Sequence, residues 1–528
     1  MKIIFLTGGV YSSLGKGVTL SSIGKVLQFE GFKCSVLKFD PYLNYNSKFL
    51  SPNQHGEVFV TKDGEETDLD LGHYERFLGI ELSAHSCCTS GKIFHSLMKK
   101  EMNGEYNGET VQIVPHLIQE IVSRFEYFEN IDTEILLVEL GGTVSDLEQK
   151  PFLLAAEYLK NKKKDDMIFI HLAPVLSLNY NGDKKTKPIQ HSLSILKKVG
   201  ITPDILILKG DSCLTEAEIS KISFNFPQIP RENIFSSCYK LDIFEIPIHL
   251  YEKEKLCDKL LSLLKLEKKN NSSERELNDW KKFNSLIKGK KKHVINVAIV
   301  GKYSSCPESY YSIIQSLKFA GYGLSAELNI SVLKSENLHS ESQLEGFHLI
   351  CIPPGFGEKS LNGIFLAIKY ARENKIPFLG ICFGMQLSVI EFFRNQLGIS
   401  DANSLEIDPE TSFPILVPWS DSKDMRVGEI EVNFSENTKL HNIYGSIKRD
   451  ARHRNRYVFN AKLASQLPEF KNSSLKISAW SGDIVEGVEL EDHPFFVGVQ
   501  YHPEFNSRPL SPEPLFIEAI SSAIKQIN

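Results

Sequence analysis

The sequence predicts two α/β domains in tandem, each built on a mainly parallel sheet. A chain of 528 residues is too long for one core, because single domains usually stop growing at about 250 to 300 residues. Short apolar runs that are typical of buried strands also alternate with helical segments, and they do so on both sides of a charged stretch near the middle. This alternation is typical of parallel sheets covered by helices.

Five apolar runs before the charged stretch are expected to form strands, and three more after it. The first group is 3–6, 35–39, 135–138, 167–172 and 205–208, and the second is 294–300, 349–352 and 377–381. Residues 267–292 have few apolar side chains and are the expected linker between a first domain, 1–266, and a second domain, 293–528. The alternative is a surface helix, since Trp280, Phe283 and Leu286 could form an apolar stripe.

The composition is that of a globular protein, with 42% hydrophobic and 24% charged residues. The net charge of -6 provides no overall basic field, so neither nucleic acid nor a membrane surface is an expected partner. No apolar run approaches the roughly 20 residues of a membrane-spanning helix, and residues 3–6 are too few for a signal peptide. The nine cysteines show no repeated metal-binding or disulfide spacing, so a reducing cytoplasm is the expected location.

A phosphate-binding loop is predicted near the N-terminus. Residues 2–17 are expected to form a strand, a loop of small residues and the start of a helix. Backbone N–H groups at such a helix start can hold a phosphate, and Lys16 adds a cation. The spacing of Gly9 and Gly15 is one residue longer than in the strict phosphate-loop pattern, and Gly17 replaces the usual Ser or Thr. A glycine-rich turn that binds nothing is the alternative.

Acidic and basic side chains near the predicted strand ends extend this hypothesis. Magnesium, which accompanies a nucleoside triphosphate, prefers oxygen ligands, and Asp70 and Glu139 are the candidates. Glu139 follows a strongly apolar strand at the edge where parallel sheets bind ligands, although an acid there is often only a surface group. Three lysines in 183–190 suit a polyphosphate, and a solvated charged loop explains them equally well.

Cys382 is the candidate nucleophile of the second domain. It lies between glycines where an apolar strand is expected to turn sharply into a helix, and such a turn exposes its apical side chain near backbone N–H groups. The alternative is an inert core cysteine. His502 and Glu504 follow another strand, and they could accept the thiol proton and orient the ring. The N–H groups of Gly355 and Phe383 are the expected oxyanion donors.

Longer stretches of the sequence resemble the CTP synthase family over nearly the whole chain. They are 8–17, 54–60, 66–77, 139–144 and 185–191, with the residues around Cys382, Glu406, Arg456 and His502. The resemblance implies a P-loop-type parallel-sheet amidoligase domain followed by a class I glutamine amidotransferase domain. The implied reaction is the ATP-dependent amination of UTP to CTP, in which ATP phosphorylates the uracil ring and ammonia from glutamine displaces that phosphate.

The resemblance also implies the roles of individual residues. The catalytic triad is Cys382, His502 and Glu504, and Asp70 and Glu139 hold Mg²⁺. ATP is bound by Ser13, Leu14, Gly15, Lys16, Gly17, Val18, Lys38 and Asp70. UTP or CTP is bound by Ser12, Asp146, Leu147, Glu148, Lys185, Thr186, Lys187, Pro188, Ile189, Gln190 and Lys221. L-Glutamine is bound by Gly355, Phe383, Gly384, Met385, Gln386, Glu406 and Arg456, and His55 lies at the mouth of the ammonia passage. A homotetramer, activation by GTP and feedback inhibition by CTP are further expectations.

The sequence departs from the family in four places. Residues 45–50 replace the family's Val-Asp-Pro-Gly-Thr-Met, and Pro354 stands where the family has glycine. Residues 102–103 replace two arginines, and 238–240 diverge on the side expected to bind adenine. One alternative is another ATP-dependent amidotransferase, such as one acting on a cobalamin precursor, and the loop 185–191 argues against it. The other is a regulatory protein without catalysis, against which the intact triad, Lys16 and the two acids argue.

Overall fold

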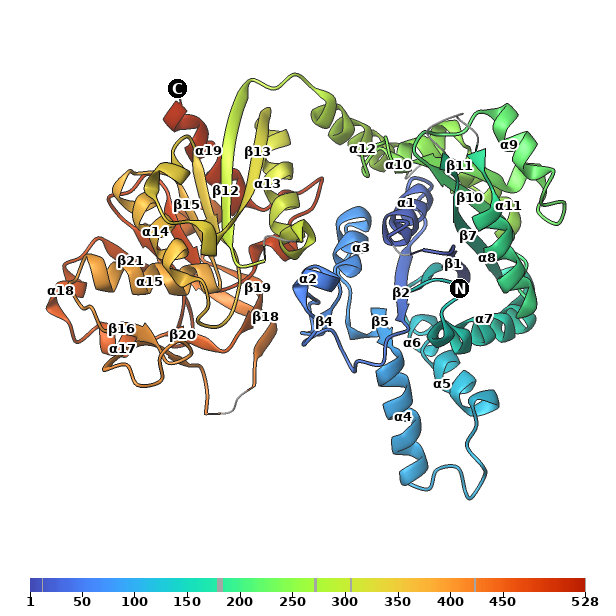
Figure 1. The fold of residues 1–528 in the computed structure, drawn as a ribbon, viewed down its shortest axis with the longest axis horizontal. Helices are drawn as coiled ribbons and strands as arrows, with labels where there is room; N and C mark the ends of the chain where they lie inside the picture. The colour runs from blue at the N-terminus through green and yellow to red at the C-terminus, as the bar shows by residue number, and fades with distance from the viewer. Residues whose placement is uncertain (12, 178–183, 270–272, 304–305, 422–423, 528) are drawn as a thin grey trace. The chain divides into compact units, whose positions relative to one another are not determined.

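The structure is a computed structural model, and it describes residues 1–11, 13–177, 184–269, 273–303, 306–421 and 424–527. The chain forms two compact units (Figure 1). The first comprises Met1–Ser47 and His73–Asn284, and the second comprises Lys48–Gly72 and Ser285–Asn528. The segment 48–72 therefore packs with the C-terminal part of the chain, although it is enclosed in sequence by residues of the first unit.

Seven strands of the described chain form the parallel sheet of the first unit, in the order β11-β10-β7-β1-β6-β2-β5. The central strand β1 is almost entirely buried, as its continuous apolar sequence predicts. The predicted parallel sheet is confirmed. Its strands are β1 (Lys2–Gly8), β2 (Cys34–Asp40), β5 (Cys87–Thr89), β6 (Ile135–Leu140), β7 (Met167–Pro174), β10 (Ile205–Gly210) and β11 (Ile234–Cys238).

Helices cover both faces of this first sheet. One face carries α4 (Ser90–Met102), α5 (Ile118–Ser123), α7 (Lys150–Lys163), α8 (Lys187–Lys198) and α9 (Glu216–Ser223). The helices α1 (Lys16–Gln28) and α11 (Leu256–Leu264) pack on the other. This three-layer arrangement leaves the carboxyl ends of the strands for ligands.

The charged stretch after the first domain contains a helix, α12 (Ser273–Lys288). Trp280 and Phe283 are buried, and the Trp280 indole donates a hydrogen bond of 2.9 Å to the carbonyl oxygen of Phe244. Lys25 of α1 forms an ion pair with Glu276 and lies over the Trp280 ring. Residues 273–284 of the expected linker thus belong to a helix that is packed on the first unit.

Nine strands of the described chain form the sheet of the second unit, in the order β13-β12-β14-β15-β23-β22-β21-β18-β19. The strands from β13 to β23 are parallel, and the rest are antiparallel. These strands are β12 (His293–Gly301), β13 (Ala326–Lys334), β14 (Leu349–Ile352), β15 (Phe378–Ile381), β18 (Arg426–Phe434), β19 (Lys448–Asn455), β21 (Leu475–Ser481), β22 (Ile484–Leu490) and β23 (Phe496–Val499).

Helices pack on both faces of the second sheet (Figure 1). The helices α14 (Leu361–Glu373) and α15 (Phe383–Asn395) cover one face, and α13 (Tyr311–Gly323) and α19 (Pro514–Ile527) cover the other. A smaller sheet of β16 (Ala402–Ser404), β17 (Phe413–Pro418) and β20 (Tyr457–Phe459) lies in the same unit. Of the helices described in either unit, none has the length and apolar character needed to cross a membrane.

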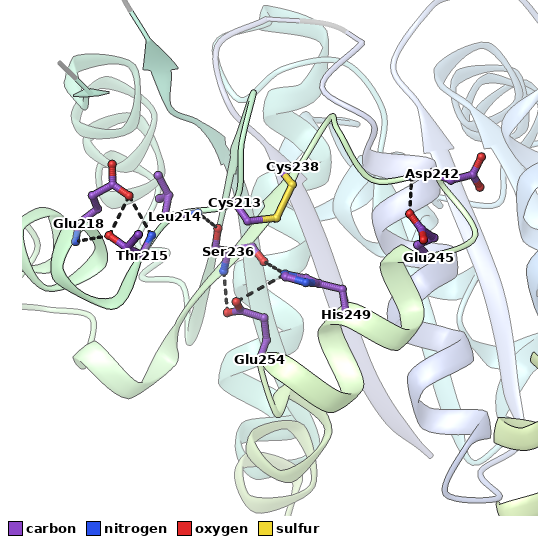
Figure 2. The surroundings of a disulfide bond; sticks show 10 residues. All are labelled: Cys213, Leu214, Thr215, Glu218, Ser236, Cys238, Asp242, Glu245, His249 and Glu254. Atoms are coloured by element: carbon purple, nitrogen blue, oxygen red, sulfur yellow. Dashed lines mark hydrogen bonds and ion pairs between the residues drawn. A yellow bond between two sulfur atoms is a disulfide. The ribbon is translucent and has the colours of Figure 1, made fainter. Parts of the chain in front are cut away.

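A disulfide bond joins Cys213 to Cys238 in the first unit (Figure 2). Cys213 follows β10 and Cys238 ends the neighbouring strand β11, so the pairing of the strands brings their Cα atoms to 4.8 Å. Two side chains hold the backbone of Ser236. The N–H of Ser236 donates to the Glu254 carboxylate at 2.9 Å, and Nε2 of His249 lies 3.0 Å from the Ser236 carbonyl oxygen. The sequence did not predict this bond, because two cysteines separated by 25 positions form no recognisable framework.

Candidate active sites

Cys382 lies on the sharp turn between β15 and α15. Its φ of 53° and ψ of -100° are unusual for a residue other than glycine. Its N–H donates a 2.7 Å hydrogen bond to the carbonyl oxygen of Val499, which ties the turn to β23. A Cβ atom at Gly384 would lie 2.2 Å from the carbonyl oxygen of Ile352, so a larger residue does not fit there. This is the geometry of a nucleophile held at the start of a helix.

His502 and Glu504 are buried beside this cysteine. The Nδ1 atom of His502 lies 2.8 Å from Oε1 of Glu504. Burial disfavours the charged imidazole, but the negative charges of Glu504 and Cys382 outweigh it and raise the pKa of His502 to about 10. Within the described residues, Nε2 of His502 has no hydrogen-bond partner. The arrangement favours an imidazolium at His502, held by Glu504 beside the candidate nucleophile.

A cavity of about 410 Å³ lies next to the triad, within the second unit. This volume is in the range of about 300 to 1,000 Å³ that is usual for small-molecule sites. The guanidinium of Arg456 lies 5.7 Å from the ring centre of Phe356, and both line the cavity with Gly355 and His502. Pro354, the departure from the family's glycine, also lines it. The cavity is therefore lined by the cationic side chains of Lys48, Arg454 and Arg456, close to the candidate nucleophile.

The other residues predicted to bind glutamine lie in the same unit. The Gln386 amide donates to the Gln500 amide oxygen at 3.0 Å, and Gln500 in turn donates to Sγ of Cys382 at 3.4 Å. Glu406 accepts from the N–H of Gly357 at 3.2 Å, and burial raises the pKa of its carboxyl group. Gln500 was not among the predicted site residues, because its position before the His502 motif gave no sign of this contact.

Residues 48–72 form part of the cavity, which the sequence did not predict. Residues 48–52 and 57–58 line it. Glu57 is buried and accepts from the N–H of Ser312 at 2.8 Å, and Arg454 donates to Glu66 at 2.8 Å. His55, which ends α2 (Pro52–His55), is exposed and does not line the cavity.

The predicted phosphate loop joins β1 to α1 in the first unit. Gly15 has a φ of 82°, a conformation that glycine adopts without strain, and α1 begins directly after it at Lys16. The Lys16 ammonium donates a 2.7 Å hydrogen bond to the carbonyl oxygen of Gly142. A Cβ atom at Gly15 would lie 2.5 Å from Nζ of Lys209, so a second lysine lies against the loop. Burial lowers the pKa of Lys209 to about 8.

The phosphate loop also has a neighbour that the sequence did not predict. Lys209 was not predicted, because it belongs to β10 and only the sheet order brings it near the loop. Ser12 lies outside the described residues. Ser13 has a φ of 60°, and Leu14 is buried. Gly17 and Val18 are in the first turn of α1.

The candidate magnesium ligands lie in different compact units. Glu139 is buried in β6 and accepts a 2.6 Å hydrogen bond from the Tyr74 hydroxyl. Lys38 is paired with it in β2 and lies 3.2 Å from Asp40. Asp70 begins α3 (Asp70–Leu78) and belongs to the second unit. No cluster of three or more His, Cys, Asp or Glu ligands occurs in the described chain. Carboxylate oxygens suit Mg²⁺, which needs only one or two of them, and the metal site stays a prediction.

The residues predicted to bind UTP or CTP lie on three segments of the first unit. Lys185 ends β9 (Lys184–Lys185), Thr186 precedes α8, and 187–190 form its first turn. Asp146 accepts from the N–H and hydroxyl of Thr143, which shapes its turn. The side chains that are exposed to solvent are Leu147, Glu148, Lys185, Lys187 and Lys221.

Comparisons with known proteins cover both units. The family model for the CTP synthase N-terminus matches residues 2–266, and the model for class I glutamine amidotransferases matches residues 306–522. A CTP synthase from Halalkalibacterium halodurans is 40% identical over 540 residues, and one from Pyrobaculum aerophilum is 42% identical over 539 residues. In both cases 99% of each chain is covered. The solved glutaminase domain of Trypanosoma brucei CTPS with bound acivicin is 32% identical, with a TM-score of 0.41, covering 44% of this chain and 94% of that one.

Proposed function

The chain belongs to the CTP synthase family, and from this premise we propose how its residues divide the reaction. The enzyme aminates UTP to CTP with nitrogen taken from glutamine. We assign nitrogen release to the glutaminase domain and nucleotide chemistry to the amidoligase domain. The proposed domain limits are 1–266 for the amidoligase and 293–528 for the glutaminase, with 267–292 as the linker, and the two family matches support them.

Glutamine hydrolysis is the chemistry that the second unit supports in most detail. The thiolate of Cys382 attacks the carboxamide carbon, and His502 gives a proton to the departing ammonia. Glu504 keeps the imidazole oriented and stabilises its charged form through the 2.8 Å contact. The N–H groups of Gly355 and Phe383 stabilise the oxyanion, while Glu406 and Arg456 hold the amino acid end of the substrate. Water then hydrolyses the glutamyl thioester.

The amidoligase step is assigned to the phosphate loop and its neighbours. The loop 13–18 and Lys38 bind ATP, while the residues of 146–148, 185–190, Ser12 and Lys221 bind UTP or CTP. ATP phosphorylates O4 of the uracil ring, and ammonia displaces that phosphate, so positioning and charge neutralisation supply most of the catalysis. Asp70 and Glu139 would hold Mg²⁺, which would neutralise phosphate charge at this site. The buried ammonium of Lys209 supports a phosphate site here.

Ammonia is proposed to reach the amidoligase site inside the protein, past His55. In bulk water at neutral pH it would be protonated to ammonium and would no longer be a nucleophile. Activation by GTP and inhibition by CTP rest on the family resemblance, and a cytoplasmic location rests on the scattered cysteines of the sequence. The Cys213–Cys238 disulfide is the feature least typical of a reducing compartment.

A homotetramer is supported by an apolar stripe on α4. Phe94, Met98 and Met102 follow one another at intervals of four residues, so they lie on one helix face. They are 39%, 50% and 73% exposed. Exposed apolar patches of this kind usually mark protein contacts. Light scattering of the purified protein, with Met98→Lys as the variant expected to dissociate, tests this assembly.

The observation that carries the proposed division of labour is the buried Cys382, His502 and Glu504 constellation beside its cavity. Purified protein supplied with UTP, ATP, Mg²⁺ and glutamine is expected to form CTP, as measured by chromatography of the nucleotides. If no CTP forms with either glutamine or ammonia as the nitrogen source, the assignment of both units is contradicted. A cobalamin-precursor amidotransferase would instead leave UTP unchanged and consume glutamine with its own acceptor.

A further inference from the structure

Lys302 follows β12, and its ammonium group lies against the loop of residues 353–357, which we term the glutamine loop. Its Nζ atom donates hydrogen bonds to the carbonyl oxygens of Phe356 at 2.8 Å and Gly357 at 2.5 Å. The same atom lies 4.7 Å from the ring centre of Phe383. One lysine thus contacts both segments that supply the proposed oxyanion donors, the glutamine loop and the start of α15.

A single peptide unit of the glutamine loop is held from both ends. Lys302 binds the carbonyl oxygen of the peptide between Phe356 and Gly357, and Glu406 accepts from the N–H of that same peptide at 3.2 Å. Rotation of this peptide would break both hydrogen bonds. Gly357 has a φ of 75°, which other residues rarely adopt, so the loop at this point depends on its contacts for a single conformation.

The charged groups around Lys302 define how pH acts on this contact. Burial lowers the pKa of Lys302 to about 8, and the nearby carboxylate of Glu406 partly opposes that shift. The guanidinium groups of Arg454 and Arg456 lie over the Phe356 ring. At neutral pH Lys302 is therefore an ammonium in a partly buried setting, where hydrogen bonds from a charged donor are stronger than neutral ones.

We propose that Lys302 is a positioning residue for glutamine hydrolysis, because it holds the glutamine loop in the orientation that presents its N–H groups to the substrate carboxamide. This role rests on the proposed glutaminase chemistry of Cys382. Lys302 acts through the loop backbone and takes no part in bond making. A lysine that only filled space would be replaceable by an unbranched apolar side chain of similar length.

Three variants separate positioning from packing. Lys302→Met keeps the length of the side chain and removes its charge and donors, Lys302→Arg keeps a charged donor, and Lys359→Met removes an exposed lysine just after the same loop. Glutamine hydrolysis by Lys302→Met is expected to fall about 10- to 100-fold in kcat/KM, the loss typical of hydrogen bonds from a charged group. Lys302→Arg recovers part of this loss, and Lys359→Met matches the unmodified protein.

The pH profile of glutamine hydrolysis supplies a readout that packing alone would not change. Activity is expected to decline as pH rises through about 8, where Lys302 loses its proton, and to decline only at higher pH in Lys302→Arg, whose guanidinium stays charged. Unfolding does not explain such a decline. The pKa of lysine in the unfolded chain is 10.5. Between pH 8 and pH 10.5 the unfolded state therefore binds more protons at this site than the folded state, and the contribution of Lys302 to stability rises with pH.

CTP synthesis from added ammonia and the melting temperature serve as controls for folding. Glutamine hydrolysis by Lys302→Met at the level of the unmodified protein would overturn the proposal. So would equal losses with glutamine and with ammonia, or a lowered melting temperature that accounts for the loss, because each indicates a structural role. If Cys382→Ala hydrolyses glutamine normally, the proposed glutaminase site itself fails, and the role of Lys302 fails with it.

Discussion

The two candidate sites differ in how far their polar groups already contact one another. In the second unit, His502 binds Glu504, Gln500 binds both Gln386 and Cys382, and one peptide of the glutamine loop is held at both ends. In the first unit, the predicted UTP-binding side chains of Lys185, Lys187 and Lys221 are exposed on separate segments. The glutaminase site is built by internal contacts, whereas the lysines predicted to bind UTP are exposed to solvent.

This difference fits the chemistry assigned to each unit. A nucleophile and its base must be pre-oriented before a small neutral amide arrives, because little binding energy is available to organise them. A triphosphate brings several negative charges, which can order lysines and backbone N–H groups on binding. We therefore expect changes in the second unit to act on glutamine alone, and changes near the phosphate loop to act with either nitrogen source.

The Glu504→Gln variant is expected to have the largest effect of the three changes that probe this contrast. Glu504 is a major cause of the raised pKa of His502, which is about 10. Its loss lowers that pKa, so the imidazolium of the variant loses its proton at a lower pH than in the unmodified protein. Glutamine hydrolysis should fall about 10³- to 10⁴-fold, as for other triads that lose their acid. Steady-state rates between pH 6 and 10 measure both effects.

The control for this prediction is Glu469→Gln, which changes an exposed acid of the same unit. It should leave the rate and the pH profile as they are. An unaltered pH profile in Glu504→Gln would contradict the electrostatic coupling of His502 and Glu504, whatever the rate.

Lys16→Met is expected to reduce CTP synthesis about 10²- to 10³-fold, because it removes a cation placed at the phosphate loop. The loss should be the same with glutamine and with ammonia, since the loop lies in the amidoligase domain. Lys99→Met, at an exposed site on α4, is the matched control. A loss confined to the glutamine-dependent reaction would argue that Lys16 does not serve ATP.

Cys213→Ser is expected to lower the unfolding free energy of the first unit by about 3 kcal/mol, because the disulfide closes a loop of 25 positions. Urea unfolding with and without dithiothreitol measures the change, and reduced unmodified protein should match the variant. Cys306→Ser, at a free cysteine, should have a smaller effect. Glutamine hydrolysis should persist in Cys213→Ser, and identical unfolding curves for all samples would show that the bond does not stabilise the unit.

The sequence predicted what depends on neighbouring residues and missed what depends on the order of strands. The strands β1, β6 and β15 could be predicted from their apolar runs. Cys382 could be predicted as a nucleophile because it lies between glycines at a strand end. The sequence did not reveal Lys209, because only the order of β10, β7 and β1 in the sheet brings it near the phosphate loop. It did not reveal the Cys213–Cys238 bond, because only the β10–β11 pairing brings these cysteines together. The contact of Lys302 could not be predicted, because its partners are carbonyl oxygens of the glutamine loop, and backbone atoms have no sequence signature.

The segment 48–72 shows the same limit at the level of whole domains. It follows strand β2 of the first unit, yet Glu57 and Glu66 bind residues of the second. Local composition does not reveal such long-range polar contacts. The domain limits drawn from the charged stretch stay a prediction for the same reason.

The most direct measurement is the rate of CTP formation by Cys382→Ala with glutamine and, separately, with ammonia. The variant is expected to lose glutamine-dependent synthesis by about 10⁴-fold or more and to keep the ammonia-dependent rate of the unmodified protein, because the amidoligase site is untouched. Retained synthesis from glutamine, or equal loss with both nitrogen sources, would contradict the division of the reaction between the two units.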